Sequence, residues 1–476
     1  MENSTIAAIA TPGGPGGIGI IKISGSKALS TAAAIFAPIA SRHPPISSER
    51  TGAVNNVLSD GFNSHQLYYG HIIDPGSRRV LDEVLLSVMK APRSYTREDV
   101  VEINAHGGQV AVNAILELVL QHGVRMAEPG EFTRRAFLNG RIDLAQAEAV
   151  IDIINARADK SLQVAAAQIN GSLSKPVEEI REYLIKFLTH TEASIDFPDD
   201  VDEFIDPAAA TMEIESAIIK PLQRLIQQHA DGNVLRDGLK VAVVGRPNVG
   251  KSSLLNCLVK KERVIVTDVP GTTRDTIEEA LNINGFPVVL ADTAGLHDPN
   301  DPIEAIGIKK AIEHVNGADL VLLMIEANRG VMNEDYKIFE QFRSKPMIIV
   351  VNKIDLVNND HIVDIPDDLG TCPSVAISAL YDRGIESLKE QIIATAFGDN
   401  SVNIETGIVP NLRQKLLLDD SLKAALAIKR ELNNGHPMEL IAIQLQYAVD
   451  ALGQILGTTV KVDVLDQIFS RFCIGK

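Results

Sequence analysis

The sequence KVAVVGRPNVGKSSLLNCL at residues 240–258 combines three parts that predict a phosphate-binding fold. The near-continuous apolar run Leu239–Val244 predicts a buried strand, a glycine-containing loop follows, and an apolar-periodic segment predicts a helix. Within it, Gly245–Ser252 matches the pattern G-x-x-x-x-G-K-S in the required strand–loop–helix context. We expect backbone N–H groups to face phosphates at the helix N-terminus, Lys251 to neutralise the β- and γ-phosphates, and Ser252 to bind Mg²⁺. A glycine-rich turn without nucleotide chemistry is the weaker alternative.

Two downstream segments predict further contacts with the metal and the γ-phosphate. TDVPGTTRD at residues 267–275 offers several threonines, of which we expect Thr273 to complete the Mg²⁺ ligands. DTAG at residues 292–295 follows a predicted strand. This order places Asp292 near the metal and the N–H of Gly295 near the γ-phosphate.

Two more segments predict that the nucleotide base is guanine. NKID at residues 352–355 follows a predicted strand, and Asp355 can accept hydrogen bonds from the N1–H and exocyclic amine of guanine, which adenine lacks. Residues 377–379 follow the last predicted strand and fit the loop behind the base. The predicted GTP-binding residues are Asn248, Val249, Gly250, Lys251, Ser252, Ser253, Thr267, Thr272, Thr273, Asp292, Thr293, Ala294, Gly295, Asn352, Lys353, Asp355, Ser378, Ala379 and Leu380.

The residue that orients the attacking water is less evident. Phosphoryl transfer needs such a residue and a cation against the developing charge. The position after DTAG is Leu296, whose side chain cannot polarise water. Glu304 is a candidate, and an ordinary first-turn acid favoured by the helix dipole is the alternative.

Composition predicts a soluble, multidomain, cytoplasmic protein. The chain has 476 residues, with 45 Lys and Arg against 62 Asp and Glu, for a net charge of −17. No apolar run reaches the roughly 18 residues that a membrane span needs. The three cysteines have spacings of neither a disulfide framework nor a zinc site. Since no segment is basic overall, an RNA contact would need a local basic patch or a partner protein.

Hydrophobic patterning predicts an α/β domain inserted into a helical one. Residues 1–139 have strand-like runs and one helical segment, as in an α+β domain. Residues 140–237 and 396–476 have helical periodicity, including one long helical stripe from Leu144 to Ile169. Residues 238–395 alternate strand and helix, as in a Ras-like α/β fold with a parallel sheet. We expect the two helical halves to pack together into one discontinuous domain.

These motifs lead to a resemblance that covers nearly the whole chain. The sequence resembles the family of tRNA modification GTPases known as MnmE or TrmE. The segments that carry the resemblance, besides GRPNVGKS and TDVPGTTRD, are ATPGGPGGIGIIKISG (10–25), EINAHGG (102–108), RRAFLNGRIDLAQAEA (134–149), EASIDFPDD (192–200) and FCIGK (472–476).

The resemblance implies a folate site and a homodimer. In the family, the N-terminal domain binds a tetrahydrofolate derivative (5-formyl- or methylene-tetrahydrofolate) and mediates constitutive dimerisation. The matching folate-binding positions are Lys22, Glu102, Arg141 and Lys476. A carboxylate pairs well with a pterin edge, and basic groups pair well with a glutamate tail.

The resemblance also implies potassium-dependent hydrolysis. Asn248 would coordinate K⁺ through its side chain, with Thr267, Val269 and Thr272 completing the site. The cation would stand where other GTPases place an arginine finger. Glu304 matches the water-orienting glutamate of the family.

The family works with a partner that carries FAD, known as MnmG or GidA, in a heterotetramer. Together they install a carboxymethylaminomethyl-type group at C5 of the wobble uridine of certain tRNAs. Cys473 in FCIGK is a candidate nucleophile near the folate site, and an inert residue near an apolar C-terminus is the alternative. The alternative function is a regulatory GTPase that acts in ribosome assembly or partner recruitment without a direct role in modification.

Overall fold

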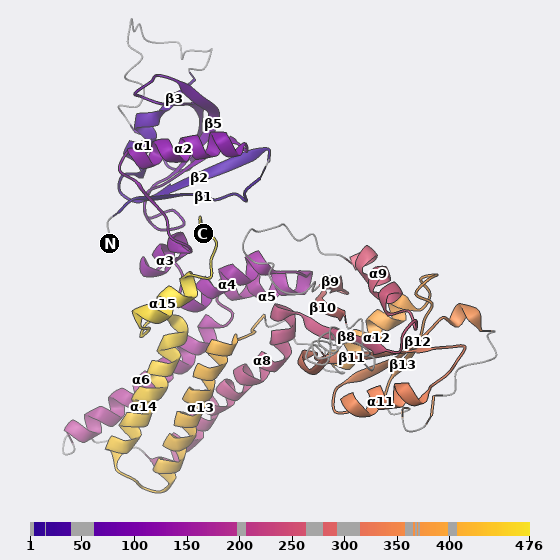
Figure 1. Cartoon of the computed structure of the whole chain (residues 1–476). Coiled ribbons are helices and arrows are strands. Elements are labelled where there is room, and N and C mark those ends of the chain that lie inside the picture. Colours follow the sequence, from indigo (N-terminus) through magenta and orange to yellow (C-terminus); the bar gives the residue numbers. More distant parts are fainter. Residues whose placement is uncertain are drawn as a thin grey trace, which may run out of the picture. The chain divides into compact units, whose positions relative to one another are not determined.

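The structure is a computed structural model that describes residues 4–14, 16–39, 61–197, 206–262, 279–292, 315–357, 365–366, 369, 372–397 and 407–476. Internal contacts divide the chain into two units. One comprises Met1–Ile151 together with Gly457–Lys476, and the other comprises Asp152–Leu456. Figure 1 labels most of their helices and strands. In the described part of the chain, no helix is both long enough and apolar enough to span a bilayer.

The N-terminal unit is built on a seven-stranded sheet in the order β3-β4-β5-β6-β2-β1-β7. All neighbouring strands are antiparallel except β1 and β7. On β2, Ile21 and Ile23 are buried while Ile20 and Lys22 are half-buried, so one face of the sheet builds a core with helices α1 and α2. The elements are β1 (Ile6–Ile9), β2 (Ile18–Ser24), α1 (Ala28–Ile35), β3 (Phe36–Pro38), β4 (Gln66–Ile73), β5 (Val80–Met89), β6 (Val100–His106), α2 (Gln109–Gln121), β7 (Arg125–Met126), α3 (Glu131–Leu138) and α4 (Leu144–Asn155).

The C-terminal segment of the chain packs within this same unit. Helix α15 (Val462–Phe469) and the residues after it bury Phe469 and Phe472 against Leu144 and Ala147 of α4. From the sequence we assign residues 457–476 to the second helical half; in the structure they pack on α4, in the first helical half predicted from the sequence, and internal contacts group both with residues 1–151. Aromatic packing explains why this segment packs on α4, because the rings of Phe469 and Phe472 lie with their centroids 5.5 Å apart in the same apolar cluster as Leu144 and Ala147.

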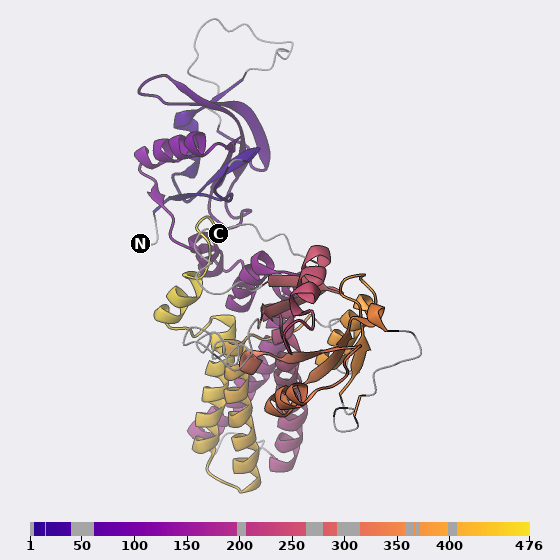
Figure 2. The same ribbon diagram turned by 45° about the vertical axis from the view of Figure 1, so that its right-hand side comes forward.

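The second unit contains a helical bundle and an α/β domain. The two helical halves pack together as expected, since α6 contacts α14, and α13 contacts α7, α8 and α14. Figure 2 shows α13 and α14 side by side along the bundle. Its elements are α5 (Asp159–Ile169), α6 (Ser174–Asp196), α7 (Pro207–Ile214), the π-helical turn η1 (Glu215–Ile219), α8 (Lys220–Asp237), α13 (Leu412–Asn433) and α14 (Met438–Leu456).

The expectation of one helical stripe from Leu144 to Ile169 is wrong. The helix ends at Asn155 and α5 begins at Asp159, because groups at the start of α5 bind partners outside the helix. The N–H of Lys160 donates to the carbonyl of Gly285 at 3.2 Å. The Ser161 hydroxyl donates to the carbonyl of Leu235 at 2.5 Å.

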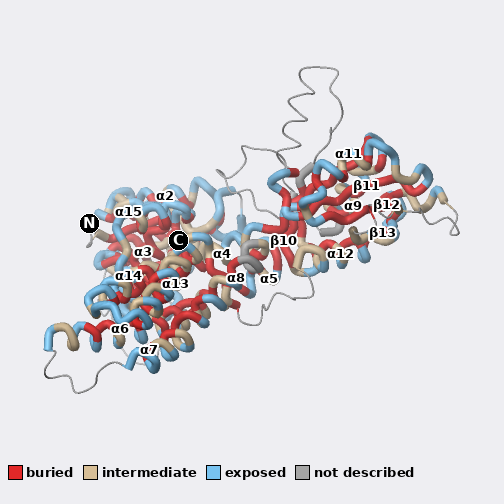
Figure 3. Tube along the Cα trace, turned by 90° about the horizontal axis from the view of Figure 1, so that it is seen from below, coloured by how far each residue is buried: buried red, intermediate tan, exposed pale blue. Residues whose placement is uncertain are grey.

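The α/β domain has a six-stranded sheet in the order β13-β12-β11-β8-β10-β9. All pairs are parallel except β9 with β10. The central strands β8, β11 and β12 are almost entirely buried, as Figure 3 shows for β11 and β12. The predicted inserted Ras-like domain is confirmed; the antiparallel edge strand β9 was not predicted. The elements are β8 (Leu239–Gly245), α9 (Lys251–Glu262), β9 (Glu279–Ile283), β10 (Phe286–Asp292), β11 (Leu320–Glu326), α11 (Asn333–Phe342), β12 (Met347–Asn352), the 3₁₀ turn η2 (Ile354–Leu356), β13 (Ser374–Ala376) and α12 (Ile385–Phe397).

Candidate functional site

The phosphate-binding loop joins β8 to α9 in a conformation that only certain residues adopt. Gly245 and Gly250 have φ values of +147° and +102°, and Asn248 has φ +62°. A Cβ at Gly250 would lie 2.2 Å from Nδ2 of Asn352, so glycine is also required sterically. The loop therefore has the turn that the sequence predicts, and α9 begins at Lys251.

Lys251 already lies over this loop. Its Nζ donates to the carbonyls of Gly245 at 2.7 Å and Arg246 at 2.9 Å. Ser252 and Ser253 follow in the exposed first turn of α9. An ammonium group and a hydroxyl at a helix N-terminus suit a phosphate chain and a hard divalent cation such as Mg²⁺.

The predicted guanine-binding residues contact the loop and one another. The Asn352 side chain donates to the carbonyl of Val249 at 2.8 Å and accepts the N–H of Ala379 at 3.0 Å. Lys353 donates to the carbonyl of Asn248 at 2.7 Å. Asn352 therefore joins the phosphate loop to the loop after β13.

Asp355 lies beside the second of these loops. Its Oδ1 accepts a hydrogen bond from the hydroxyl of Ser378 at 2.5 Å, and Ser378 is fully buried. Leu380 follows in the same loop and is 75% exposed. A carboxylate held in this way can accept from the two adjacent donors of a guanine ring.

Several predicted site residues lie outside the described part of the chain. Asp292 ends β10, but its side chain is not among those described. The others are Thr267, Val269, Thr272, Thr273, Thr293, Ala294, Gly295 and Glu304.

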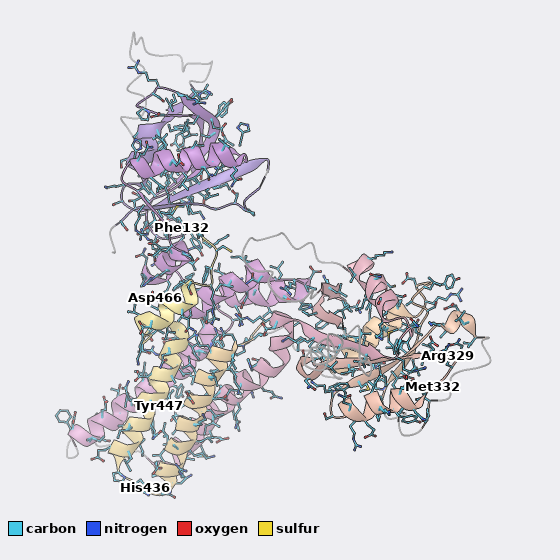
Figure 4. All side chains as sticks on the ribbon, viewed as in Figure 1. Phe132, Arg329, Met332, His436, Tyr447 and Asp466 are labelled. Atoms are coloured by element: carbon cyan, nitrogen blue, oxygen red, sulfur yellow. The ribbon has the colours of Figure 1, made fainter. Side chains whose placement is uncertain are left out.

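A second group of predicted residues meets in the N-terminal unit. Lys22 on β2 and Glu102 on β6 are direct cross-strand partners, with Nζ and Oε1 3.5 Å apart. The ammonium of Lys22 lies 5.7 Å from the ring centroid of Tyr95 and 5.6 Å from that of Phe132, which Figure 4 labels. Arg141 lies over the Tyr95 ring, with Cζ 4.6 Å from its centroid.

Tyr95 links these groups through its own contacts. The carbonyl of Tyr95 accepts a hydrogen bond from Nη1 of Arg141 at 3.1 Å. The hydroxyl of Tyr95 lies 3.0 Å from the hydroxyl of Thr133. Burial raises the pKa of Tyr95, so the phenol stays neutral near pH 7. Sequence reasoning missed Tyr95 and Phe132, because only the fold places these rings beside Lys22.

The C-terminal residues reach the same helix α3 that carries Phe132. The N–H of Phe132 donates to the carbonyl of Lys476 at 3.2 Å, and that of Gly130 donates to the carbonyl of Cys473 at 3.5 Å. A Cβ at Gly475 would lie 2.6 Å from the carbonyl oxygen of Ile9, so the segment passes close to β1. Cys473 itself is exposed. Glu102 with the bases Lys22 and Arg141 beside two rings suits a flat ligand with an anionic tail, and Lys476 reaches α3 through its backbone carbonyl.

Comparisons with known proteins cover both units. The family model described as MnmE helical domain matches residues 144–473, and the model described as GTP-binding protein TrmE N-terminus matches residues 5–141. A relative named tRNA modification GTPase MnmE, from Moorella thermoacetica, is 45% identical over 480 residues and covers 100% of both chains. The chain belongs to the MnmE family. A second MnmE relative, from Alkaliphilus oremlandii, is 43% identical and covers 100% of this chain and 99% of its own.

Among solved structures, Era from Aquifex aeolicus bound to GDP and AlF₄⁻ is 28% identical, covers 39% of this chain and 65% of its own, and has a TM-score of 0.28. The resemblance to MnmE inferred from the sequence is thus confirmed over the full length. With the family, the class of enzyme is also established as a GTPase named for tRNA modification.

Proposed function

We propose that this protein is a potassium-activated GTPase that acts with a flavin-containing partner on the wobble uridine of certain tRNAs. The product is a carboxymethylaminomethyl-type group at C5, made in the cytoplasm by a complex that contains two copies of each protein. One observation carries the GTPase part of the proposal: Asn352 and Lys353 of the guanine motif bind the carbonyls of Val249 and Asn248 in the phosphate loop. Membership of the MnmE family supports the tRNA part.

Each residue of the nucleotide site has a proposed task. Lys251 binds the β- and γ-phosphates, Asp355 selects guanine, and Glu304 orients the attacking water. Ser252 and Thr273 hold Mg²⁺, which neutralises charge on the phosphates when bound.

Asn248, with Thr267, Val269 and Thr272, holds the monovalent cation. The Asn248 side chain is exposed and shows no hydrogen bond to another described residue, so its amide oxygen is available to a cation. When bound, K⁺ supplies the positive charge that an arginine finger supplies elsewhere.

The N-terminal unit holds the one-carbon tetrahydrofolate derivative. Glu102 faces the pterin edge, and Lys22, Arg141 and Lys476 bind its negatively charged parts. When bound, the folate supplies the one-carbon unit. Cys473 is proposed to take part in the chemical step. On this view, Cys473→Ser abolishes tRNA modification and leaves GTP turnover intact.

Two measurements test the proposal. Nucleoside mass spectrometry of tRNA from a strain without this protein is expected to show undermodified wobble uridine. Normal modification in that strain would instead favour the ribosome-assembly GTPase. GTP turnover by the purified protein is expected to be faster in K⁺ than in Na⁺ at equal ionic strength. Equal rates would remove Asn248 from a cation site.

A further inference from the structure

Two buried carboxylates lie next to the phosphate loop but belong to none of the sequence motifs. Glu326 ends β11 and is 4% exposed, and Asp335 lies in the first turn of α11 and is fully buried. Carboxylates are rarely buried unless they are paired with a cation. Here Asp335 pairs with Arg246, a residue of the loop, and Glu326 pairs with Lys353, which donates a hydrogen bond to the loop.

Asp335 anchors the first part of the loop through Arg246. Both carboxylate oxygens of Asp335 lie 3.0 Å from Nε of Arg246, which is itself 7% exposed. One of these oxygens also accepts the N–H of Met332 at 3.0 Å, so the carboxylate is fixed by the N-terminus of α11. The position of Arg246 in the loop is therefore set from the helix.

Glu326 anchors the next part of the loop through Lys353. Its carboxylate binds Nζ of Lys353 with one oxygen and Nε of Arg329 with the other, the latter at 3.2 Å. Arg329 and Met332 are labelled in Figure 4, in the segment that leads from β11 to α11. The same Lys353 Nζ donates to the carbonyl of Asn248 at 2.7 Å. A hydrogen bond from an ion-paired ammonium holds this peptide group in a fixed direction.

Asn248 lies between these two anchors. Its backbone has the left-handed φ of +62°, and its exposed side chain makes no hydrogen bond to another described residue. The direction of its amide therefore depends on the backbone on either side. We propose that Glu326 and Asp335 are positioning residues that hold Asn248 ready for the monovalent cation, Glu326 through Lys353 and Asp335 through Arg246. This inference rests on the proposed cation role of Asn248.

The test uses the full chain and the variants Glu326→Gln and Asp335→Asn. The matched control is Glu340→Gln, which removes an exposed carboxylate on the same helix as Asp335, paired with Arg343 at 3.1 Å. Amide hydrogen exchange of residues 245–250 is measured first, without nucleotide or K⁺. We expect faster exchange in both variants and no change in the control. Unchanged exchange in Glu326→Gln would overturn the anchoring role.

The K⁺ dependence of GTP hydrolysis is measured next, at constant ionic strength. The K⁺ concentration for half-maximal rate is expected to rise about five- to tenfold in both variants, in the range of coupling between linked sites. GDP affinity is measured in Na⁺ alongside, and the change in K⁺ half-saturation is expected to exceed any change in GDP affinity, because the anchors act on the direction of the Asn248 side chain. An unchanged K⁺ half-saturation beside a K⁺-dependent wild type would overturn the inference.

Two controls keep the outcomes distinct. A wild type with equal rates in K⁺ and Na⁺ would contradict the proposed function, and the cation part of this inference with it, whatever the exchange result. Thermal unfolding identifies a variant that does not fold. If Asp335→Asn does not fold, Glu326→Gln carries the test alone, because its partner Lys353 remains 30% exposed to solvent.

Discussion

At the residue scale, Asp355 is expected to determine the choice of base. Asp355→Asn replaces one acceptor by a donor, so it should weaken GTP binding roughly a hundredfold, the combined effect of two charge-assisted hydrogen bonds. It should also admit xanthosine triphosphate, whose ring presents an acceptor at that edge. Competition binding with both nucleotides measures this. Unchanged preference for guanine would contradict the assignment of Asp355.

Gly250 makes a second residue-scale prediction. Gly250→Ala adds a Cβ 2.2 Å from Nδ2 of Asn352 at a φ of +102°, so the loop must move. We expect nucleotide binding to be lost while the helical content remains. Circular dichroism and nucleotide titration separate the two effects. The matched control is Gly317→Ala, where nothing lies within 4 Å of the added Cβ.

The Glu131 carboxylate predicts a pH dependence of the N-terminal unit. Burial alone would raise the pKa of Glu131, but hydrogen bonds from Arg125 and the N–H of Glu128, with the charge of Arg135, lower it below its ordinary value of 4.5. A lowered pKa in the folded state gives stability that is present above the ordinary pKa and is lost as the pH falls through the folded value.

We therefore expect hydrogen exchange of residues 125–138 to speed up below about pH 4.5, after correction for intrinsic rates. In Glu131→Gln the exchange should already be faster at pH 7 and should change less with acid. Glu128→Gln is the control, since its side chain is exposed. An equal pH dependence in Glu131→Gln and wild type would contradict this.

At the element scale, periodicity predicted the elements whose own residues carry the signal. The strands β8, β11 and β12 are near-continuous apolar runs, and α2 buries Val112, Ile115 and Val119 at helical spacing. The break between α4 and α5 was not predictable in this way. Its cause is a partner 125 residues away, the carbonyl of Gly285 that binds Lys160.

The contact between α5 and the β9–β10 hairpin makes an element-scale prediction. Phe286 is 5% exposed, and its ring centroid lies 4.6 Å from that of Phe397. Nζ of Lys160 lies 3.6 Å from the ring centroid of Phe286. Phe286→Ala should lower the free energy of unfolding by about 3 kcal/mol, as for other buried phenylalanines. Lys160→Met keeps the aliphatic packing and should cost only about 0.5–1 kcal/mol. Denaturant titrations compare the two, and equal losses would contradict the ranking.

At the scale of the whole molecule, the residues proposed for the nucleotide site follow more directly from the sequence than those proposed for the folate site. The phosphate motif and the guanine motif are each a contiguous run of residues, so their proposed roles follow from residue type and spacing within each motif. Lys22, Glu102, Arg141 and Lys476 are scattered along the chain and were assigned only through family resemblance. Their meeting around Tyr95 and α3 depends on tertiary packing, as do the partners of Asp335 and Glu326.

Phe469 provides a whole-molecule prediction. It is 2% exposed, and its ring contacts those of Phe137 and Phe472 in the N-terminal unit. Phe469→Ala should destabilise this unit by about 3 kcal/mol and weaken folate binding, because residues 473–476 follow directly. GTP affinity should not change, since the nucleotide site lies in the other unit. Isothermal titration with each ligand measures both, and a parallel loss of GTP affinity would contradict this division.

The packing of residues 457–476 onto α3 and α4 also has a consequence for biosynthesis. A ribosome adds about 5–20 residues per second. Synthesis of the 305 residues of Asp152–Leu456 therefore delays residues 457–476, which complete the N-terminal unit, by roughly 15–60 s. During that time the apolar side chains of Phe137 and Leu144 on the nascent polypeptide lack their cover. In this interval the bundle and the nucleotide domain can fold before the unit that was translated first is complete.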